Sequence, residues 1–298
     1  MASVYEVVTD RILTALENGH VPWKREWKTS GKGGRLPYNL VSGKPYRGIN
    51  VFTLFCSGYA NNGWCTYKQA QSLGYQVRKG EKSTPVIFWK FPTKAELLEN
   101  PKAAPFARFY SVFNIEQLDG VPVELPFEGQ EFDPIAECEN AVATFMASAS
   151  HPTLAHGGDR AFFSQSRDHV QMPPREAFAS AGGYYATLFH EFAHSTGVKH
   201  RLNRPEFDTL GEFGDEPYSR EELTAEFTSA FLCAETGCSN EERINNSIAY
   251  IQSWIKVLKN DKKLAIEAAQ KAQRAADFIL LRSFAGSSSE SEGEGVAA

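Results

Sequence analysis

Apolar residues recur at spacings of three and four positions in several stretches of the chain, which is the pattern of a helix with one buried face. The first stretch opens with a capping box formed by Ser3 and Glu6, and it stops at Gly19. Further helices are expected over residues 176–189, from about Ser219, from about Asn240 and over residues 262–281. The last of these is rich in alanine and contains neither proline nor glycine, so it is predicted to close the fold.

Runs of β-branched and aromatic residues predict short strands at residues 84–91, 106–113, 160–164 and 169–172. The apolar stretch after Gly48, which contains Phe52, Leu54 and Phe55, has helical spacing instead. These elements predict an α+β protein of two domains, with a mixed α/β domain over residues 1–125 and a second domain over residues 126–285. Residues 286–298 consist largely of serine, glutamate and glycine without core residues, and they are predicted to be a disordered tail.

Basic and acidic residues are distributed unequally between the two predicted domains. Residues 1–120 contain 16 Lys and Arg against 9 Asp and Glu, whereas residues 121–298 contain 15 against 27. The segment 119–129 between them is rich in proline, glycine and acidic residues and has no clear period, as expected of a linker. Two domains with different partners would show this asymmetry.

The composition also limits where the protein works. No apolar run approaches the roughly 20 residues of a membrane span, and the N-terminus lacks the layout of a signal peptide, so a cytoplasmic protein without membrane contact is expected. The five cysteines are odd in number and form no C-x-x-C pair, which argues against a disulfide framework or a zinc ribbon. They are interpreted as reduced thiols in the core.

Residues 190–194 read His-Glu-Phe-Ala-His, the H-E-x-x-H pattern of zinc hydrolases. On a helix, His190 and His194 lie one above the other on one face, where both imidazoles can bind one metal ion. The carboxylate of Glu191 then lies beside that ion, where it can take a proton from a water molecule and hand it to a departing amine. The motif therefore predicts a metallohydrolase, most commonly a peptidase.

A catalytic zinc site needs a third protein ligand, and the sequence offers two. His200 completes the longer pattern H-E-x-x-H-x-x-G-x-x-H of the metzincins, but these enzymes also require a methionine turn, and all three methionines lie upstream of the motif. Glu222 on the next expected helix gives the layout of a gluzincin, with Glu226 one turn further along to hydrogen-bond a ligand histidine. Glu222 is favoured, although with Ser219 it also forms a capping box, S-x-x-E, which would be purely structural.

Basic and aromatic residues are interleaved in the N-terminal half. Residues 20–94 contain 13 Lys and Arg, only two acidic residues and 13 aromatic residues. Single-stranded nucleic acid selects for this combination, because unpaired bases stack on rings while phosphates attract cations. About half of the aromatic residues are expected in the core, whereas the basic turn around Gly80, with Arg78, Lys79 and Lys82, must lie at the surface.

Several motifs in order along the chain resemble one family, the ArdC-type antirestriction proteins. In the N-terminal half the resemblance rests on residues 37–39, 46–50, 64–70, 77–82 and 112–118. In the C-terminal half it rests on residues 168–173, 184–197, 201–204 and 220–223, which are similar to the family's zincin-like metallopeptidase domain. The resemblance covers nearly the whole chain.

This resemblance implies an antirestriction protein of plasmids and conjugation, with an N-terminal domain that binds single-stranded DNA and a gluzincin-type domain. It implies His190, His194 and Glu222 as ligands of Zn²⁺, with Mn²⁺ as another possible metal, and Glu191 as the catalytic base. The expected partners are single-stranded DNA and an unidentified protein substrate. The candidate DNA contacts carried over from the resemblance are Tyr46, Arg47, Asn50, Trp64, Lys68, Gln69, Arg78 and Lys79.

Two functions are compatible with these observations. In the first, the protein is a zinc metalloprotease whose basic domain holds DNA; the donor that stabilises the oxyanion is then open among Tyr184, Tyr185, Tyr218 and His200. In the second, it is a non-proteolytic protein that binds single-stranded DNA, and its zincin domain is a structural remnant. Replacement of Glu191 distinguishes them, because only the first function depends on that carboxylate.

Overall fold

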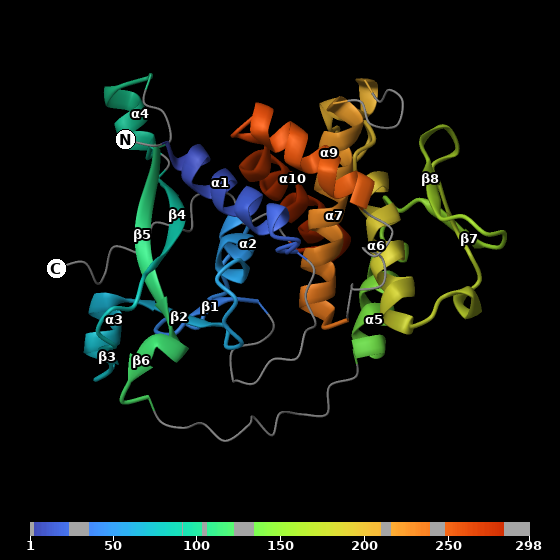
Figure 1. Ribbon diagram of the computed structural model, residues 1–298. Helices are drawn as coiled ribbons and strands as arrows, with labels where there is room; N and C mark the ends of the chain where they lie inside the picture. Colours follow the sequence, from blue (N-terminus) through green and yellow to red (C-terminus); the bar gives the residue numbers. More distant parts are fainter. Residues whose placement is uncertain are drawn as a thin grey trace.

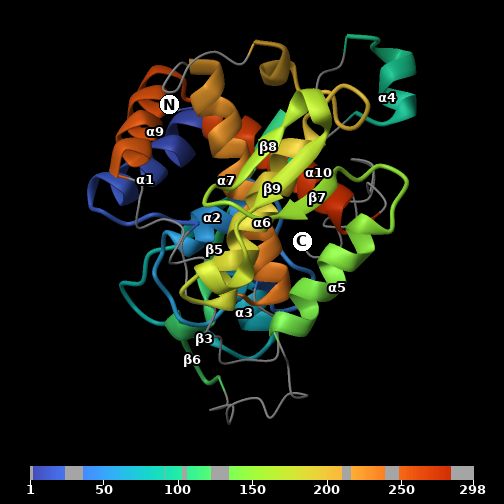
Figure 2. The same cartoon turned by 90° about the vertical axis from the view of Figure 1, so that its right-hand side faces the viewer.

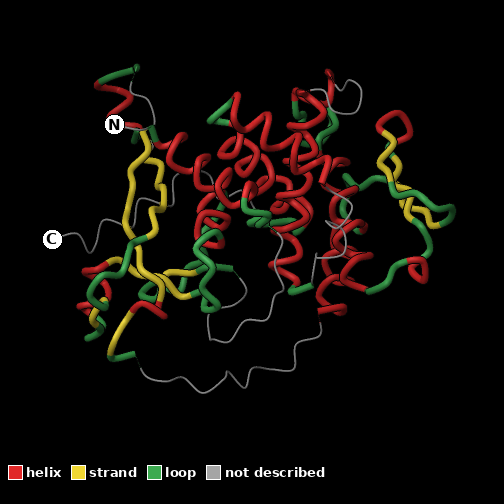
Figure 3. The backbone as a smooth tube through the Cα atoms, viewed as in Figure 1, coloured by secondary structure: helices red, strands yellow, loops and turns green. Residues whose placement is uncertain are grey.

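Helices occupy the middle of the molecule, and its β-structure lies at the two ends (Figures 1 and 3). The structure is a computed structural model. It describes residues 3–23, 36–90, 92–102, 106–121, 134–209, 216–238 and 248–282. The mixed α/β architecture agrees with the α+β fold predicted from the sequence.

The predicted first helix is present as α1 (Val4–Glu17). Its capping box is formed, with the Ser3 hydroxyl accepting from the Glu6 N–H at 3.2 Å and the Glu6 carboxylate accepting from the Ser3 N–H at 2.6 Å. Gly19 follows the helix at φ = +77°, a left-handed conformation that favours glycine and turns the chain away. Local sequence signals therefore determine both ends of this helix.

A four-stranded sheet forms one end of the molecule, in the order β1-β2-β5-β4. Its long ribbon consists of β4 (Thr84–Lys90) and β5 (Phe106–Asn114), both close to their predicted positions, and α4 (Lys94–Glu99) lies between them in the chain. The shorter strands are β1 (Tyr38–Asn39) and β2 (Gly63–Thr66), while β3 (Gln76–Val77) pairs with β6 (Leu118–Asp119). Helices α2 (Ile49–Phe55) and α3 (Tyr67–Ser72) and the 3-10 turn η1 (Ile115–Gln117) complete this half.

The other end carries a three-stranded sheet in the order β7-β9-β8, which lies in front of α6 when the molecule is viewed from that side (Figure 2). Strands β8 (Phe162–Ser164) and β9 (His169–Met172) agree with the sequence prediction. Strand β7 (Thr153–His156) was not predicted, because it is short, little buried and stabilised by parallel pairing with β9 rather than by its own pattern. This region also contains α5 (Pro134–Met146) and the 3-10 turns η2 (Gln165–Arg167) and η3 (Arg175–Ala177).

The described residues of the C-terminal half also form the following helices and 3-10 segment: α6 (Ala181–Thr196), η4 (Pro205–Thr209), α7 (Glu216–Thr236), α9 (Ile248–Asn260) and α10 (Leu264–Ile279). Helix α6 begins later than the predicted position 176, because the Ser180 hydroxyl caps it by accepting from the Gly183 N–H at 3.1 Å. Helix α7 begins three residues before the predicted Ser219. The predicted start near Asn240 lies outside the described residues, and α10 confirms the predicted closing helix.

One hydrophobic core joins the two halves. The Trp23 ring lies 4.8 Å from the ring of Phe227 on α7 and 5.4 Å from that of Trp254 on α9, measured between centroids. Phe52 of α2 stacks on Phe231 of α7 at 4.9 Å. The N-terminal elements therefore pack directly on the helices that carry the metal centre described below.

Two further predictions fall outside the described residues, the domain boundary after residue 125 and the tail at 286–298. The five cysteines are free thiols, four of them buried, as predicted. Within the described ranges no helix has both the length and the apolar character that crossing a membrane would require.

Candidate metal centre and nucleic-acid surface

Helix α6 brings the two histidines of the H-E-x-x-H motif together. His190 and His194 are four residues apart on one helix face, and their Nε2 atoms lie 2.9 Å from each other. Glu191 lies next to His190 on the same helix and is also buried. The positions that vary in the motif, Phe192 and Ala193, are fully buried and anchor the helix in the core.

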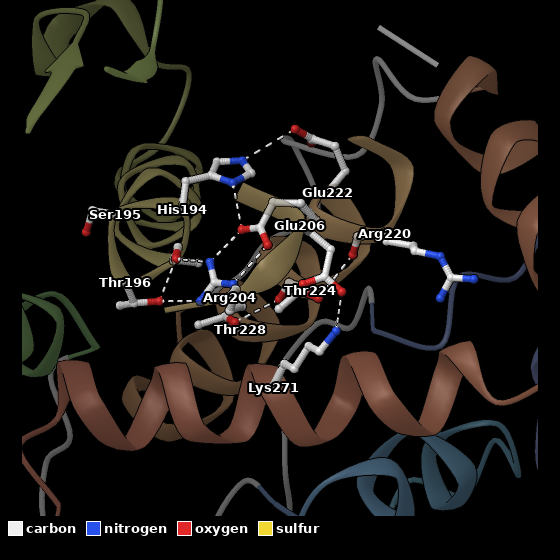
Figure 4. Close-up of polar contacts among 12 residues, drawn as sticks. His194, Ser195, Thr196, Arg204, Glu206, Arg220, Glu222, Thr224, Thr228 and Lys271 are labelled. Atoms are coloured by element: carbon white, nitrogen blue, oxygen red, sulfur yellow. Dashed lines mark hydrogen bonds and ion pairs between the residues drawn. The ribbon is translucent and has the colours of Figure 1, made fainter. Parts of the chain in front are cut away.

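Glu222 reaches the same point from α7. Its Oε2 lies 3.5 Å from His190 Nε2 and its Oε1 lies 3.4 Å from His194 Nε2. One ligand atom from each of the three residues falls within 4.8 Å of the others, as Figure 4 shows in part for His194 and Glu222. Two imidazoles and one carboxylate are a donor set that suits a divalent cation such as zinc, and the residues present therefore fit the predicted metal.

The capping alternative for Glu222 is wrong. Because α7 begins at Glu216, Ser219 lies within the helix rather than ahead of it. Its hydroxyl lies 2.8 Å from the Ser253 hydroxyl of α9 and ties the two helices together. Glu222 is thus available to the histidines.

His200, the metzincin alternative, is directed elsewhere. It follows the end of α6, its side chain is 60% exposed, and its Nε2 lies 3.3 Å from the carboxylate of Asp168. The cluster of ligand atoms does not include it. The chain turns away after Gly197, so the literal metzincin pattern does not bring a third histidine to the site.

A separate carboxylate orients each histidine. Glu226 Oε1 lies 3.3 Å from His190 Nδ1, the contact expected from the sequence, and Glu221 Oε1 lies 3.2 Å from His194 Nδ1. A carboxylate that accepts from Nδ1–H leaves Nε2 deprotonated and facing the metal position. Glu221 was missed by the sequence analysis, although it directly precedes Glu222.

Arg204 holds Glu221 in place from the opposite side. Its Nε donates to Oε2 at 2.8 Å and its Nη2 to Oε1 at 2.5 Å, and the whole arginine is buried. The same guanidinium donates to the Ala193 carbonyl oxygen and to the Thr196 hydroxyl, so it also fastens the end of α6 (Figure 4). The pattern of residues 201–204 did not by itself predict a function. The fold shows that Arg204 positions Glu221.

The carboxylates around His194 favour a positive charge at that imidazole, which a proton provides and which a cation bound at Nε2 would provide in its place. Burial lowers the pKa of His194, but the carboxylates of Glu222, Glu221 and Glu191 outweigh burial and raise it to about 10. Burial also disfavours the charged form of Glu222, which raises the pKa of this carboxyl group. The two histidines outweigh burial and hold the pKa well below its usual value. The ligand carboxylate is therefore ionised, as binding of a cation requires.

The four possible oxyanion donors lie in different surroundings. The Tyr184 hydroxyl lies 2.8 Å from His156 Nε2, the Tyr185 hydroxyl donates to Glu139 at 2.5 Å, and His200 pairs with Asp168. Tyr218 lies four residues before Glu222 on α7 and hence on the same helix face. It is half-buried, which leaves part of its side chain at the surface.

Three of the candidate DNA contacts lie in the core instead of at the surface. Trp64 on β2 is 2% exposed, and Tyr46 is buried, which raises the pKa of its hydroxyl to about 12. Asn50 on α2 donates to the Ile87 carbonyl oxygen at 2.7 Å and accepts from the Ile87 N–H at 2.8 Å, and so it covers the outer edge of β4. Because they pack and pair inside the fold, these side chains are not accessible to a DNA strand in this structure.

Of the remaining DNA candidates, three are exposed basic residues, and the other two are held by contacts within the protein. Lys68, Arg78 and Lys79 are exposed, and Arg78 is positioned by an ion pair with Glu81 at 3.0 Å. Gln69 accepts from the Thr66 N–H at 2.9 Å as part of a capping box. Arg47 is 42% exposed and pairs with Asp277 of α10.

The β4–β5 ribbon carries aromatic surface that the sequence analysis did not single out. Phe106, Arg108 and Tyr110 alternate along β5 and so share one face of it, with Phe106 and Tyr110 46% and 39% exposed. The Arg108 guanidinium lies 5.2 Å from the centre of the Phe106 ring. An exposed strip of two rings with a cation between them is a suitable platform for unpaired bases.

Comparison with known proteins agrees with this description. Residues 2–113 match the family described as the N-terminal domain of anti-restriction factor ArdC, and residues 140–271 match the family of zincin-like metallopeptidases. Two crystal structures of the antirestriction ArdC protein from the R388 plasmid, one metal-free and one with Mn(II) bound, are similar with a TM-score of 0.71. They are 34% and 37% identical to this chain, and each comparison covers 93% of this chain and 97% of the other.

Two further relatives match this chain, one over most of its own length and one over about a quarter of it. The uncharacterised protein y4eC of Sinorhizobium fredii (strain NBRC 101917 / NGR234) is 39% identical over 93% of this chain and 91% of its own length. A DNA primase TraC of Escherichia coli is 37% identical over 93% of this chain, which spans only 27% of that protein.

The zincin-like match, the Mn(II)-bound relative and the cluster of His190, His194 and Glu222 together identify a divalent metal site. Matches to both halves and to a whole solved relative extend over nearly the entire chain. The chain therefore belongs to the family of ArdC-type antirestriction proteins, with an ArdC N-terminal domain and a zincin-like metallopeptidase domain.

Proposed function

We propose that this protein protects the incoming DNA of a mobile element from host restriction, by binding single-stranded DNA and cleaving a protein in the cytoplasm with a zinc-dependent peptidase site. The convergence of His190, His194 and Glu222 beside Glu191 carries the peptidase part of this proposal. The exposed basic and aromatic residues of the N-terminal half support the DNA-binding part. The protein substrate is unidentified.

The side chains divide the chemistry among them. His190, His194 and Glu222 would hold the cation, which when bound polarises a water molecule and the carbonyl group of the peptide. Glu191 takes a proton from the water and passes it to the departing amine. Glu226 and Glu221 keep the histidine rings in position.

A restriction-protection assay with two variants tests the proposal. Glu191→Ala keeps the three metal ligands and the DNA surface, so protection should be lost while binding of Zn²⁺ and of DNA persists. Arg78→Ala with Lys79→Ala should weaken DNA binding and reduce its dependence on salt, because two phosphate contacts disappear. Full protection by Glu191→Ala would instead favour a non-proteolytic DNA-binding protein with a remnant zincin domain.

A matched pair on β5 tests the aromatic surface separately. Tyr110 and Phe109 are adjacent and similarly exposed, at 39% and 42%, but they point to opposite faces of the strand. Tyr110→Ala should weaken binding of an oligothymidylate by an amount corresponding to about 1–3 kcal/mol, the value of one base stacked on an aromatic ring. Phe109→Ala should leave the affinity close to that of the parent protein, and an equal loss in both variants would contradict the assignment of this face.

A further inference from the structure

Arg47 links the N-terminal half to the last helix of the metallopeptidase half. Its guanidinium pairs with Asp277 on α10, whose carboxylate is only 6% exposed. The neighbouring Gly48 N–H donates to Gln273 Oε1 at 3.1 Å, and Gln273 Nε2 in turn donates to Asp277 at 3.3 Å. Arg47 itself remains 42% exposed, so one cation faces both a buried carboxylate and the solvent.

The same helix also reaches the metal centre. Lys271, between one and two turns before Asp277 on α10, pairs with Glu206 of η4. Glu206 lies two residues after Arg204, which holds Glu221 against the ligand His194. Figure 4 shows the Lys271–Glu206 pair and, separately, the contacts of Arg204 near His194.

Close packing makes α10 a stiff connection between these two ends. Its buried face consists mainly of alanines, which allow a near approach to neighbouring helices: Ala265, Ala268, Ala269, Ala272, Ala275 and Ala276. Helix α7, which carries Glu221 and Glu222, packs against α10 along much of its length. A shift at one end of a closely packed helix is therefore transmitted to the other.

We propose that binding of single-stranded DNA and binding of the divalent metal oppose each other, and that the coupling runs through α10. A DNA phosphate competes with Asp277 for Arg47. When Arg47 turns to the phosphate, Asp277 loses its cation in a buried position, which is unfavourable unless the end of α10 moves. That movement disturbs the Lys271–Glu206 pair and the packing of α7, which carries Glu221 and Glu222, and the metal is bound less tightly. The inference rests on the proposed DNA binding.

Linkage makes the proposal quantitative, because the factor by which metal weakens DNA binding must equal the factor by which DNA weakens metal binding. The experiment uses the full chain, a fluorescein-labelled oligothymidylate and Mn²⁺. Fluorescence anisotropy gives the DNA affinity in EDTA and in Mn²⁺ at constant ionic strength, and calorimetry gives the Mn²⁺ affinity with and without the oligonucleotide. We expect about a five-fold or larger reduction in both directions.

Two variants assign the effect to α10. Asp277→Asn removes the competing charge and should bind DNA several-fold more tightly in EDTA, with little remaining effect of Mn²⁺. Glu235→Gln is the matched control, because Glu235 pairs with Arg282 just beyond the end of α10 and its replacement removes the same charge without touching Arg47. Glu222→Ala corrects for any screening of the DNA by Mn²⁺, since it lacks a metal ligand.

The outcomes separate the inference from the function on which it rests. Parent protein that binds the oligonucleotide equally well with and without Mn²⁺ overturns the coupling but leaves the proposed DNA binding intact. If Glu235→Gln binds the oligonucleotide as tightly as Asp277→Asn does, the effect comes from the loss of any negative charge. That result overturns the role of Arg47 and Asp277. Parent protein that does not bind the oligonucleotide at all overturns both.

Discussion

Arg204 and Glu221 form a buried ion pair in which the guanidinium grips both oxygens of the carboxylate, at 2.8 Å and 2.5 Å. Neither residue belongs to the cluster of metal ligands, yet one oxygen of Glu221 accepts from His194. It converts a flexible histidine into a ligand of fixed direction.

Glu221→Gln should reduce the affinity for Zn²⁺ by about 10- to 100-fold, because the amide cannot hold both His194 and Arg204 as a carboxylate does. It should also lower the free energy of unfolding by about 3–5 kcal/mol, since Arg204 keeps a buried charge without its partner. Calorimetric titration and denaturant unfolding measure the two effects. A double replacement, Arg204→Met with Glu221→Met, should recover part of the stability but none of the metal affinity. Metal affinity equal to that of the parent would contradict the orienting role.

Removal of a ligand should abolish the stabilisation that metal provides. A metal present at about 100 times its dissociation constant stabilises the folded protein by about 2.7 kcal/mol, which raises the melting temperature. Glu222→Ala should melt at the same temperature with and without Zn²⁺, whereas Glu226→Gln, which retains all three ligands, should still show a smaller increase. A full increase for Glu222→Ala would mean that the third ligand lies elsewhere.

Gly197→Ala should destabilise the protein although its backbone is helical. At φ = −74° an alanine would ordinarily be tolerated, but its Cβ would overlap the Phe207 ring and lie 2.7 Å from Arg204 Nη2. The expected loss is about 2–3 kcal/mol in the free energy of unfolding. Gly63→Ala is the comparison, because there the closest atom is the flexible end of Leu40 at 2.6 Å. If both variants lose the same stability, the close packing around Arg204 is not what requires glycine.

Asn50→Ala should reduce the stability of the fold without changing its affinity for DNA. Both hydrogen bonds to the Ile87 backbone are buried, and their loss should cost about 2 kcal/mol or more in unfolding free energy. The folded variant should bind an oligothymidylate as the parent does, as measured by anisotropy. Asn100→Ala, at the exposed end of α4, should change stability by less than about 0.5 kcal/mol. A large loss of DNA affinity in stable Asn50→Ala protein would restore the residue as a DNA contact.

The Asp261–Arg220 pair should make stability depend on acid pH. Burial raises the pKa of Asp261, but the hydrogen bonds from Arg220 at 2.6 Å and from the Lys263 N–H at 2.9 Å outweigh it and lower the pKa. The pKa of Asp261 is lower in the folded than in the unfolded protein. The pair therefore stabilises the folded protein at pH values above the unfolded pKa of about 4, and this stabilisation is lost as the pH falls through the folded pKa. Parent protein should thus exceed Asp261→Asn in unfolding free energy by about 1 kcal/mol or less near pH 7, and by less still near pH 3. A difference that grows on acidification would contradict the assignment.

Local signals in the sequence determined the elements that need no distant partner. The capping box at Ser3, the runs of β-branched and aromatic residues in the β4–β5 ribbon and the helical spacing of His190 and His194 all act within a few positions, and the structure agrees with each of them. Family motifs extended this to the metallopeptidase half as a whole. Strand β7 escaped notice because its pairing partner begins 16 residues later.

Only the tertiary structure decided which residues meet. Glu222 prevails over His200 because α7 packs across α6 while the chain turns away after Gly197, and spacing along the sequence contains neither fact. Trp64 and Lys68 come from one basic aromatic stretch, yet the sheet buries the first and exposes the second. A short-range pattern indicates only which side of one helix or strand is apolar. Burial of a residue and contacts between distant segments depend instead on how helices and sheets pack together.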